Sequence, residues 1–193
     1  CKRDLKNCSN ISMKFTKFIK ISVLLFFLIG CSKQSKIEKE IATIPVEIKI
    51  ERFERLLADV TPDNLGDLKK KYPFLFSERY ADSLWLSRVK DTIQIELNEE
   101  VEKKFPNLSK EKEELHALFQ HIQYYFPEIE TPRIVTITSD VDYHNKIVLS
   151  KGLLIISLDT YLGKDHHFYE GIQKYFRQGF EKKYMIPNIA SMY

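Results

Sequence analysis

One stretch decides the fold: Lys146-Ile147-Val148-Leu149-Ser150-Lys151-Gly152-Leu153-Leu154-Ile155-Ile156-Ser157-Leu158. Two apolar, β-branched runs flank Ser150-Lys151-Gly152, which predicts a β-hairpin with Gly152 in its turn. The second run, from Leu153 to Leu158, is apolar at successive positions, so both of its faces must be covered. It is therefore expected to be central in its sheet, and aspartate at Ile155 or Ile156 is expected to be severely destabilising.

Two earlier segments predict further strands. Arg133–Thr138 is rich in β-branched residues. In Val46–Glu51, apolar and charged residues alternate with a period of two, which indicates a half-buried strand. With the hairpin at 147–158, these segments predict a small mixed sheet.

Helices are expected before this sheet. Thr61-Pro62-Asp63 is typical of a helix start, with Thr61 as the N-cap, and Pro73 ends that helix. Residues 77–105 are expected to be mostly helical, with a break near Lys90-Asp91. The clearest helix, Ser109–Tyr125, is expected to cover one face of the sheet with its apolar stripe, which consists of Leu115, Leu118, Phe119, Ile122 and Phe126.

The C-terminal part predicts one more helix, which starts around Pro187. Because the chain stops at Tyr193 while that helix is gathering an apolar face, we expect the sequence to be truncated there. The second face of the sheet would then be covered by elements beyond Tyr193. The fold class is α+β: a helical N-terminal part followed by a small mixed sheet with a central hairpin, in one domain over residues 44–193.

The N-terminal residues predict an export signal. The first methionine is Met13, so residues 1–12 are expected to be upstream translation. Residues 13–30 combine a cationic start with an apolar run that is too short to span a bilayer, which needs ~20 apolar residues. The run ends in Leu28-Ile29-Gly30-Cys31, which resembles the lipobox of bacterial lipoproteins.

The lipobox resemblance implies a lipid on Cys31. The thiol would be alkylated by a diacylglycerol, and cleavage would follow Gly30. Two or three acyl chains anchor a protein stably, because each buried methylene adds about 0.8 kcal/mol. Residues 31–43 are expected to form a polar tether. The alternative is an incidental cysteine behind an ordinary signal peptide.

Charge argues against nucleic-acid binding. The whole chain has a formal charge of +3, with 30 basic and 27 acidic residues. Six of the basic residues and one acidic residue precede Cys31, so 24 basic and 26 acidic residues remain from Cys31 onward. A domain with a net charge of −2 and interspersed signs has no electrostatic reason to bind a phosphate backbone. Cys1 and Cys8 precede Met13, so the mature chain has no pair of cysteines for a disulfide.

The histidines do not predict a metal site or a cofactor. His116 and His121 are five residues apart, about 140° around a helix, which is poor geometry for a shared metal ion. His166 and His167 are expected to be solvated loop residues. The aromatic clusters at Tyr72, Tyr124–Phe126 and Tyr161 are either a stacking surface for a ligand or, as we favour, packing at the ends of elements. No catalytic motif is found, so no active-site residue is predicted.

Several segments resemble the GldB family of gliding-motility lipoproteins. Their order and spacing, rather than any one motif, carry the resemblance from about Ile48 to Tyr193. The segments are Lys49–Phe53, Leu68–Pro73, Tyr124–Glu128, Tyr169, Tyr184–Asn188 and, above all, Leu158-Asp159-Thr160-Tyr161-Leu162-Gly163.

This resemblance implies an envelope lipoprotein that acts with the gliding and associated secretion machinery. The family also looks distantly similar to zinc-metallopeptidase (zincin-like) domains, but the helix near Pro187 contains no zinc ligands. We therefore expect a non-enzymatic interaction component, anchored through Cys31 to an inner or outer membrane. The alternative is an exported zinc-dependent hydrolase whose metal ligands lie beyond Tyr193.

Overall fold

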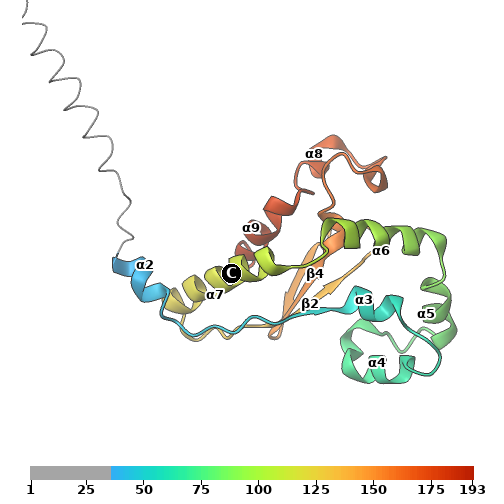
Figure 1. Ribbon diagram of the computed structural model, residues 1–193, viewed down its shortest axis with the longest axis horizontal. Coiled ribbons are helices and arrows are strands. Elements are labelled where there is room, and N and C mark those ends of the chain that lie inside the picture. Colours follow the sequence, from blue (N-terminus) through green and yellow to red (C-terminus); the bar gives the residue numbers. More distant parts are fainter. Residues whose placement is uncertain (1–35) are drawn as a thin grey trace, which may run out of the picture. The chain divides into compact units, whose positions relative to one another are not determined.

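The computed structural model describes residues 36–193 (Figure 1). The chain divides into two compact units, residues 1–40 and residues 41–193. The second unit contains the sheet and all helices after α2 (Lys36–Ile41). The expected signal peptide at 13–30 and the expected lipidation residue Cys31 lie outside the described residues.

The sheet has four strands: β1 (Ile50–Arg52), β2 (Arg133–Ile137), β3 (Ile147–Ser150) and β4 (Leu153–Ser157). Their order in the sheet is β1-β2-β4-β3. β1, β2 and β4 are parallel, and β3 is antiparallel to β4. The predicted α+β class with a small mixed sheet is therefore confirmed.

The predicted hairpin is formed by β3 and β4. Ser150 pairs with Leu153, so Lys151 and Gly152 make a two-residue turn. Both turn residues have positive φ, 47° for Lys151 and 74° for Gly152, as a type I′ hairpin turn requires. β4 lies between β2 and β3, which confirms the central position of the second run, whereas β3 is an edge strand.

The first strand is shorter than the predicted Val46–Glu51. Only Ile50–Arg52 joins the sheet, because these residues find partners in Ile134–Thr136 of β2. Residues 46–49 precede that pairing and belong to no strand. Ile48 is nevertheless buried, so the alternation in this segment reports burial rather than a strand ladder.

The helices follow the predicted order with local differences. α7 (Ser109–Tyr125) has the predicted bounds. The predicted break near Lys90-Asp91 separates α5 (Asp82–Arg88) from α6 (Thr92–Lys104). α4 begins at Leu65, later than expected, because residues 62–64 form a turn in which Asn64 Oδ1 accepts the amide hydrogen of Thr61 at 2.8 Å. Within the described residues, no helix is long and apolar enough to cross a bilayer. The helices and 3-10 turns of the second unit are α3 (Phe53–Ala58), α4 (Leu65–Lys71), η2 (Pro73–Leu75), α5 (Asp82–Arg88), α6 (Thr92–Lys104), α7 (Ser109–Tyr125), η3 (Leu158–Thr160), η4 (His167–Tyr169), α8 (Lys174–Arg177), η5 (Lys182–Tyr184) and α9 (Met185–Ala190).

A larger core covers one face of the sheet. Ile134 of β2 and the β4 residues Leu154 and Ile156 belong to it, together with residues of α6, α7 and α9. Figure 1 shows these helices beside the sheet. Leu115 and Phe119 of α7 are fully buried there. The expectation that this helix covers one sheet face is therefore confirmed.

A smaller core covers part of the opposite face. Val135 of β2 and Leu153 of β4 contact side chains from α3, α4 and α5, including Phe53, Leu65 and Trp85. The expectation that only elements beyond Tyr193 would cover this face is therefore wrong, because residues 53–89 fold back onto it. α3, which begins this layer, was not predicted from the sequence.

One polar cluster attaches this second layer to the sheet. Arg133 donates two hydrogen bonds to the Glu51 carboxylate, both at 2.9 Å, and the Tyr72 hydroxyl donates a third at 2.8 Å. The hydrogen bonds of Arg133 and Tyr72 lower the pKa of Glu51 to about 2 against the opposing effect of burial. The Arg133 guanidinium also lies over the Tyr72 ring, 4.9 Å from its centre.

Candidate functional site

A cavity lies where the parallel strands end, and we call it the edge cavity. Its volume is about 810 Å³. Its walls come from α5, the first turns of α6, the loop that follows β2, and η4. The carboxyl ends of parallel strands are a common place for ligand sites in proteins that contain such sheets.

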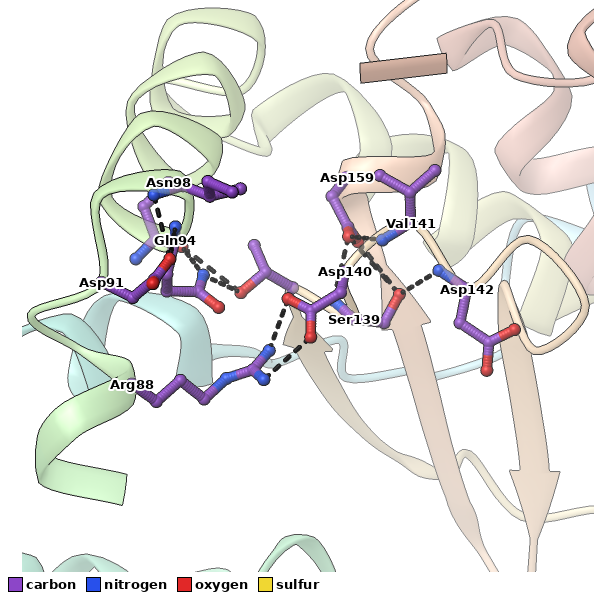
Figure 2. Close-up of polar contacts among 11 residues, drawn as sticks. Arg88, Asp91, Gln94, Asn98, Ser139, Asp140, Val141, Asp142 and Asp159 are labelled. Carbon is purple, nitrogen blue, oxygen red and sulfur yellow. Dashed lines mark hydrogen bonds and ion pairs between the residues drawn. The ribbon is translucent and has the colours of Figure 1, made fainter. Parts of the chain in front are cut away.

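The loop after β2 is held by one buried carboxylate. Asp159 accepts hydrogen bonds from the backbone amides of Ser139 at 2.9 Å and Val141 at 2.7 Å, and from the Ser139 hydroxyl at 3.3 Å (Figure 2). Between these amides the chain is left-handed, with φ of 57° at Asp140 and 59° at Val141. A branched residue such as Val141 rarely adopts this conformation, so the loop depends on its anchor.

The environment of Asp159 is unusual for a carboxyl group. The residue is completely buried in η3, which directly follows β4. Burial raises the pKa of the Asp159 carboxyl above its usual range, although the amides of Val141 and Ser139 act against this shift. Both of its carboxylate oxygens accept hydrogen bonds from the loop after β2. Asp159 therefore positions the part of the cavity wall that this loop forms.

An ion pair at the rim joins α5 to this loop. Arg88 donates two hydrogen bonds of 2.8 Å to the two carboxylate oxygens of Asp140 (Figure 2). The side chains are 31% and 63% exposed, so the pair adds little to stability. Its two planar groups are open to solvent and to a ligand.

The first turns of α6 supply a polar side chain beneath the rim. Asp91 caps this helix by accepting hydrogen bonds from the amides of Ile93 and Gln94. The Gln94 side chain donates through Nε2 to Asn98 at 3.0 Å and to Thr138 at 3.1 Å (Figure 2). Its Oε1 is buried and has no hydrogen-bond partner within residues 36–193, and the same is true of the indole Nε1 of Trp85.

The remaining walls are apolar. Leu84 and Ile93 are 48% and 65% exposed although both are large aliphatic residues. Leu84, Ile93, Leu97 and Val101 recur at helical spacing along the chain. Of these four residues, Leu97 and Val101 are buried, whereas the exposed Leu84 and Ile93 line the edge cavity.

A second buried carboxylate, Glu54, is fully partnered. Glu54 follows β1 in α3 and accepts hydrogen bonds from Arg52 and, at 2.7 Å, from the Thr136 hydroxyl. Arg52 also donates to the Phe105 carbonyl at 2.9 Å. This cluster ties β1 to β2 and to the end of α6, so we assign it a structural role.

Comparison with known proteins identifies the family. A family model described as gliding motility protein GldB matches residues 34–193. The chain belongs to the GldB family. No curated protein and no solved structure matched it.

None of the five histidines of this GldB family member lines the edge cavity. His166 Nε2 lies 3.1 Å from a Glu100 oxygen, and His167 Nε2 lies 3.0 Å from Glu96, so both pair with α6. His166 is only 13% exposed, so the expectation of a solvated residue is wrong for it. Its hydrogen bond lowers the pKa of Glu100. Over residues 36–193, no three side chains of His, Cys, Asp or Glu are grouped so that they could hold a metal ion.

The aromatic clusters divide into two kinds. Tyr72 and Tyr161 are completely buried, as expected for packing at the ends of elements. Tyr125 and Phe126 are exposed at the end of α7 instead. None of these residues lines the edge cavity.

Sequence reasoning missed the edge cavity and its anchor. Asp159 contacts amides that lie 18 and 20 residues earlier in the chain, a distance that no periodic pattern reports. One signal could have located it, because Asp159 lies in Leu158–Gly163, the segment with the clearest resemblance to the GldB family. The structure buries Leu158, Asp159, Thr160, Tyr161 and Leu162.

Proposed function

We propose that this chain is a lipid-anchored component of the bacterial gliding machinery with a non-enzymatic, protein-binding role. The observation that carries the proposal is the match to the gliding motility protein GldB family over residues 34–193. In this proposal the domain is tethered to a membrane of the cell envelope. It contacts other proteins of the gliding or secretion machinery.

The edge cavity supports binding rather than catalysis. Its acidic groups have positional tasks: Asp159 holds the loop, Asp91 caps α6, and Asp140 pairs with Arg88. The cavity wall is largely apolar and includes Gln94 and Trp85, whose buried Oε1 and Nε1 atoms have no hydrogen-bond partner among residues 36–193. Concave apolar surfaces with a few polar groups are typical of binding sites.

The sequence around Cys31 supports the anchor. Leu28-Ile29-Gly30-Cys31 follows an apolar run that is preceded by Lys14, Lys17 and Lys20. This order is that of an export signal, and a diacylglycerol thioether with an added acyl chain would hold the protein on a bilayer.

The test is complementation of a strain that lacks the gene. Deletion should abolish gliding, the wild-type gene should restore it, and Cys31→Ser should fail to restore it. The Cys31→Ser protein should also leave the membrane fraction or stay unprocessed, and intact-mass measurement should find the lipid on the wild type. Cys8→Ser is the matched control, because Cys8 precedes Met13, and it should restore gliding fully.

Two results would overturn this proposal. A deletion strain that glides normally would remove the motility role. A wild-type protein that is unlipidated and free of membranes would remove the anchor at Cys31.

A further inference from the structure

Exposed large side chains gather around the edge cavity. Tyr80, Leu84 and Ile93 are all exposed large residues, and all three line this cavity. Large apolar side chains that gather around one hollow differ from the scattered exposed residues that are normal on a protein surface. The cavity therefore offers a place for an apolar group of a ligand.

The polar atoms within this wall define what else the ligand carries. Gln94 is 4% exposed, and its Oε1 accepts no hydrogen bond. Its Nε2 is already used by Asn98 and Thr138, which fixes the orientation of the amide (Figure 2). In Trp85 the unpaired group is a donor: its buried indole N–H has no acceptor among the described residues. One unused acceptor and one unused donor match the N–H and C=O of a peptide group.

The rim sets the charge of the ligand. Arg88 and Asp140 neutralise each other with two hydrogen bonds, so neither sign dominates the opening. A volume of about 810 Å³ accommodates a few residues of a chain. A phosphate or another strongly charged ligand would find no uncompensated partner at this rim.

We propose that the edge cavity binds a near-neutral peptide segment of a partner protein, with one large aliphatic or aromatic side chain in the cavity and its backbone peptide group at Gln94. The inference rests on the proposed protein-binding role. Its readout is separate from gliding, because peptide binding is measured on the purified protein and motility on cells.

Trp85 fluorescence can report binding in the cavity. Trp85 is the single tryptophan of the chain and lines the cavity, so its fluorescence responds to an occupant. The full chain, reconstituted in phosphatidylcholine vesicles, is titrated with acetyl-Ala-Ala-Leu-Ala-Ala-amide. The comparison peptides replace leucine by phenylalanine or by serine. A further analogue has an ester in place of the amide that follows leucine, which removes one N–H donor.

Two neighbouring variants separate the cavity from the rest of the surface. Ile93→Asp places a carboxylate in the cavity mouth. Ile95→Asp is the matched control, because Ile95 is 44% exposed on the same helix and lines a different hollow, between α3 and α6. An acidic residue near the N-terminus of α6 is tolerated at both positions.

The expected result is saturable binding of the leucine and phenylalanine peptides, with the serine peptide much weaker. The ester analogue should bind about three-fold more weakly than the amide. Ile93→Asp should weaken binding about ten-fold or more, and Ile95→Asp should leave it unchanged. In Gln94→Met, the preference for the amide over the ester should vanish; this ratio does not depend on how much of the variant is folded.

Other outcomes would overturn the inference. If none of the peptides changes Trp85 fluorescence while deletion still abolishes gliding, the proposed function stands and the peptide site does not. Equal binding of amide and ester, or competition by octyl glucoside as strong as that of the peptides, would assign the cavity to acyl chains or to general apolar ligands. Equal losses in Ile93→Asp and Ile95→Asp would place the binding elsewhere.

Discussion

Asp159 shows how one buried side chain can shape a site that it does not enter. Its carboxylate satisfies the amides of Ser139 and Val141, which no strand or helix partner satisfies. Between them, Asp140 and Val141 are held in a left-handed conformation that costs conformational energy. The position of Asp140 opposite Arg88 follows from this anchor.

Asp159→Ala should therefore be strongly destabilising. It leaves two partly buried amides without acceptors, so the free energy of unfolding should fall by about 2–4 kcal/mol. Asp159→Asn keeps one acceptor oxygen and should cost less. Denaturant unfolding of the two variants checks the order, and equal midpoints for wild type and Asp159→Ala would show that the loop does not need this anchor.

Glu51 makes the free energy of unfolding depend on pH in the acidic range. Its folded-state pKa of about 2 lies below its ordinary value of 4.5, so the folded protein holds the ionised form more firmly than the unfolded chain does. The contribution is complete above pH 4.5 and is lost as the pH falls toward 2. After discounting for solvent screening, we expect a loss of about 1–2 kcal/mol across this window.

Arg133→Met isolates this effect, because Arg133 is the main cause of the shift. The variant should be less stable than wild type at pH 7, and the difference should shrink between pH 4.5 and pH 2. Urea unfolding at a series of pH values measures it. A difference that stays constant with pH would show that Arg133 acts only through its packing on Tyr72.

At the scale of elements, β4 has two faces with different surroundings. Ile156 is 1% exposed and packs in the larger core, whereas Ile155 is partly exposed and belongs to neither core. Ile156→Asp should therefore lower the free energy of unfolding by about 3–5 kcal/mol, because it buries an unpaired charge. Ile155→Asp should cost clearly less, which refines the expectation from sequence that both changes are severe.

Denaturant midpoints of the two variants check this difference. The positions are adjacent on one strand, so changes in strand propensity are the same and the contrast reports burial alone. Equal losses at both positions would mean that the outer face of β4 is covered as fully as the inner face.

The hairpin and α7 could be predicted because their signals are local. Lys151-Gly152 supplies the turn between two apolar runs, and Pro127 follows the end of α7. β1 could not be bounded, because its length is set by the β2 residues that it pairs with, more than 80 positions later. Local patterns report which residues are buried, and the partner decides whether they form a strand.

The apolar periodicity that predicts the helices does not predict the edge cavity. Ile93 lies four residues before Leu97 and eight before Val101, so a helical repeat places all three in one stripe. In the structure only the later turns of α6 meet the larger core, and Ile93 lies at the cavity. A repeat identifies the face of a helix, but it does not tell where along the helix the neighbouring element ends.

At the scale of the second unit, the two cores meet in one strand. Ile134 and Val135 are adjacent in β2, and they point into the larger and the smaller core respectively. Further links join the layers around the sheet: Arg55 of α3 donates to both Glu102 oxygens of α6, at 2.8 Å and 2.7 Å. We therefore expect residues 41–193 to unfold in a single cooperative transition.

Trp85 and Leu115 allow a direct test of this cooperativity. Trp85 packs against the smaller core, and Leu115 is fully buried in the larger core on the opposite sheet face. Leu115→Ala should lower the free energy of unfolding by about 2–5 kcal/mol through a cavity in the larger core. If the cores are one unit, the midpoint of Trp85 fluorescence should shift by the same amount as the helical circular dichroism. Lys112→Ala, on the exposed side of the same helix, should move neither signal. A Leu115→Ala protein in which circular dichroism is lost early while Trp85 fluorescence keeps the wild-type midpoint would show that the two cores unfold independently, and that β2 does not couple them.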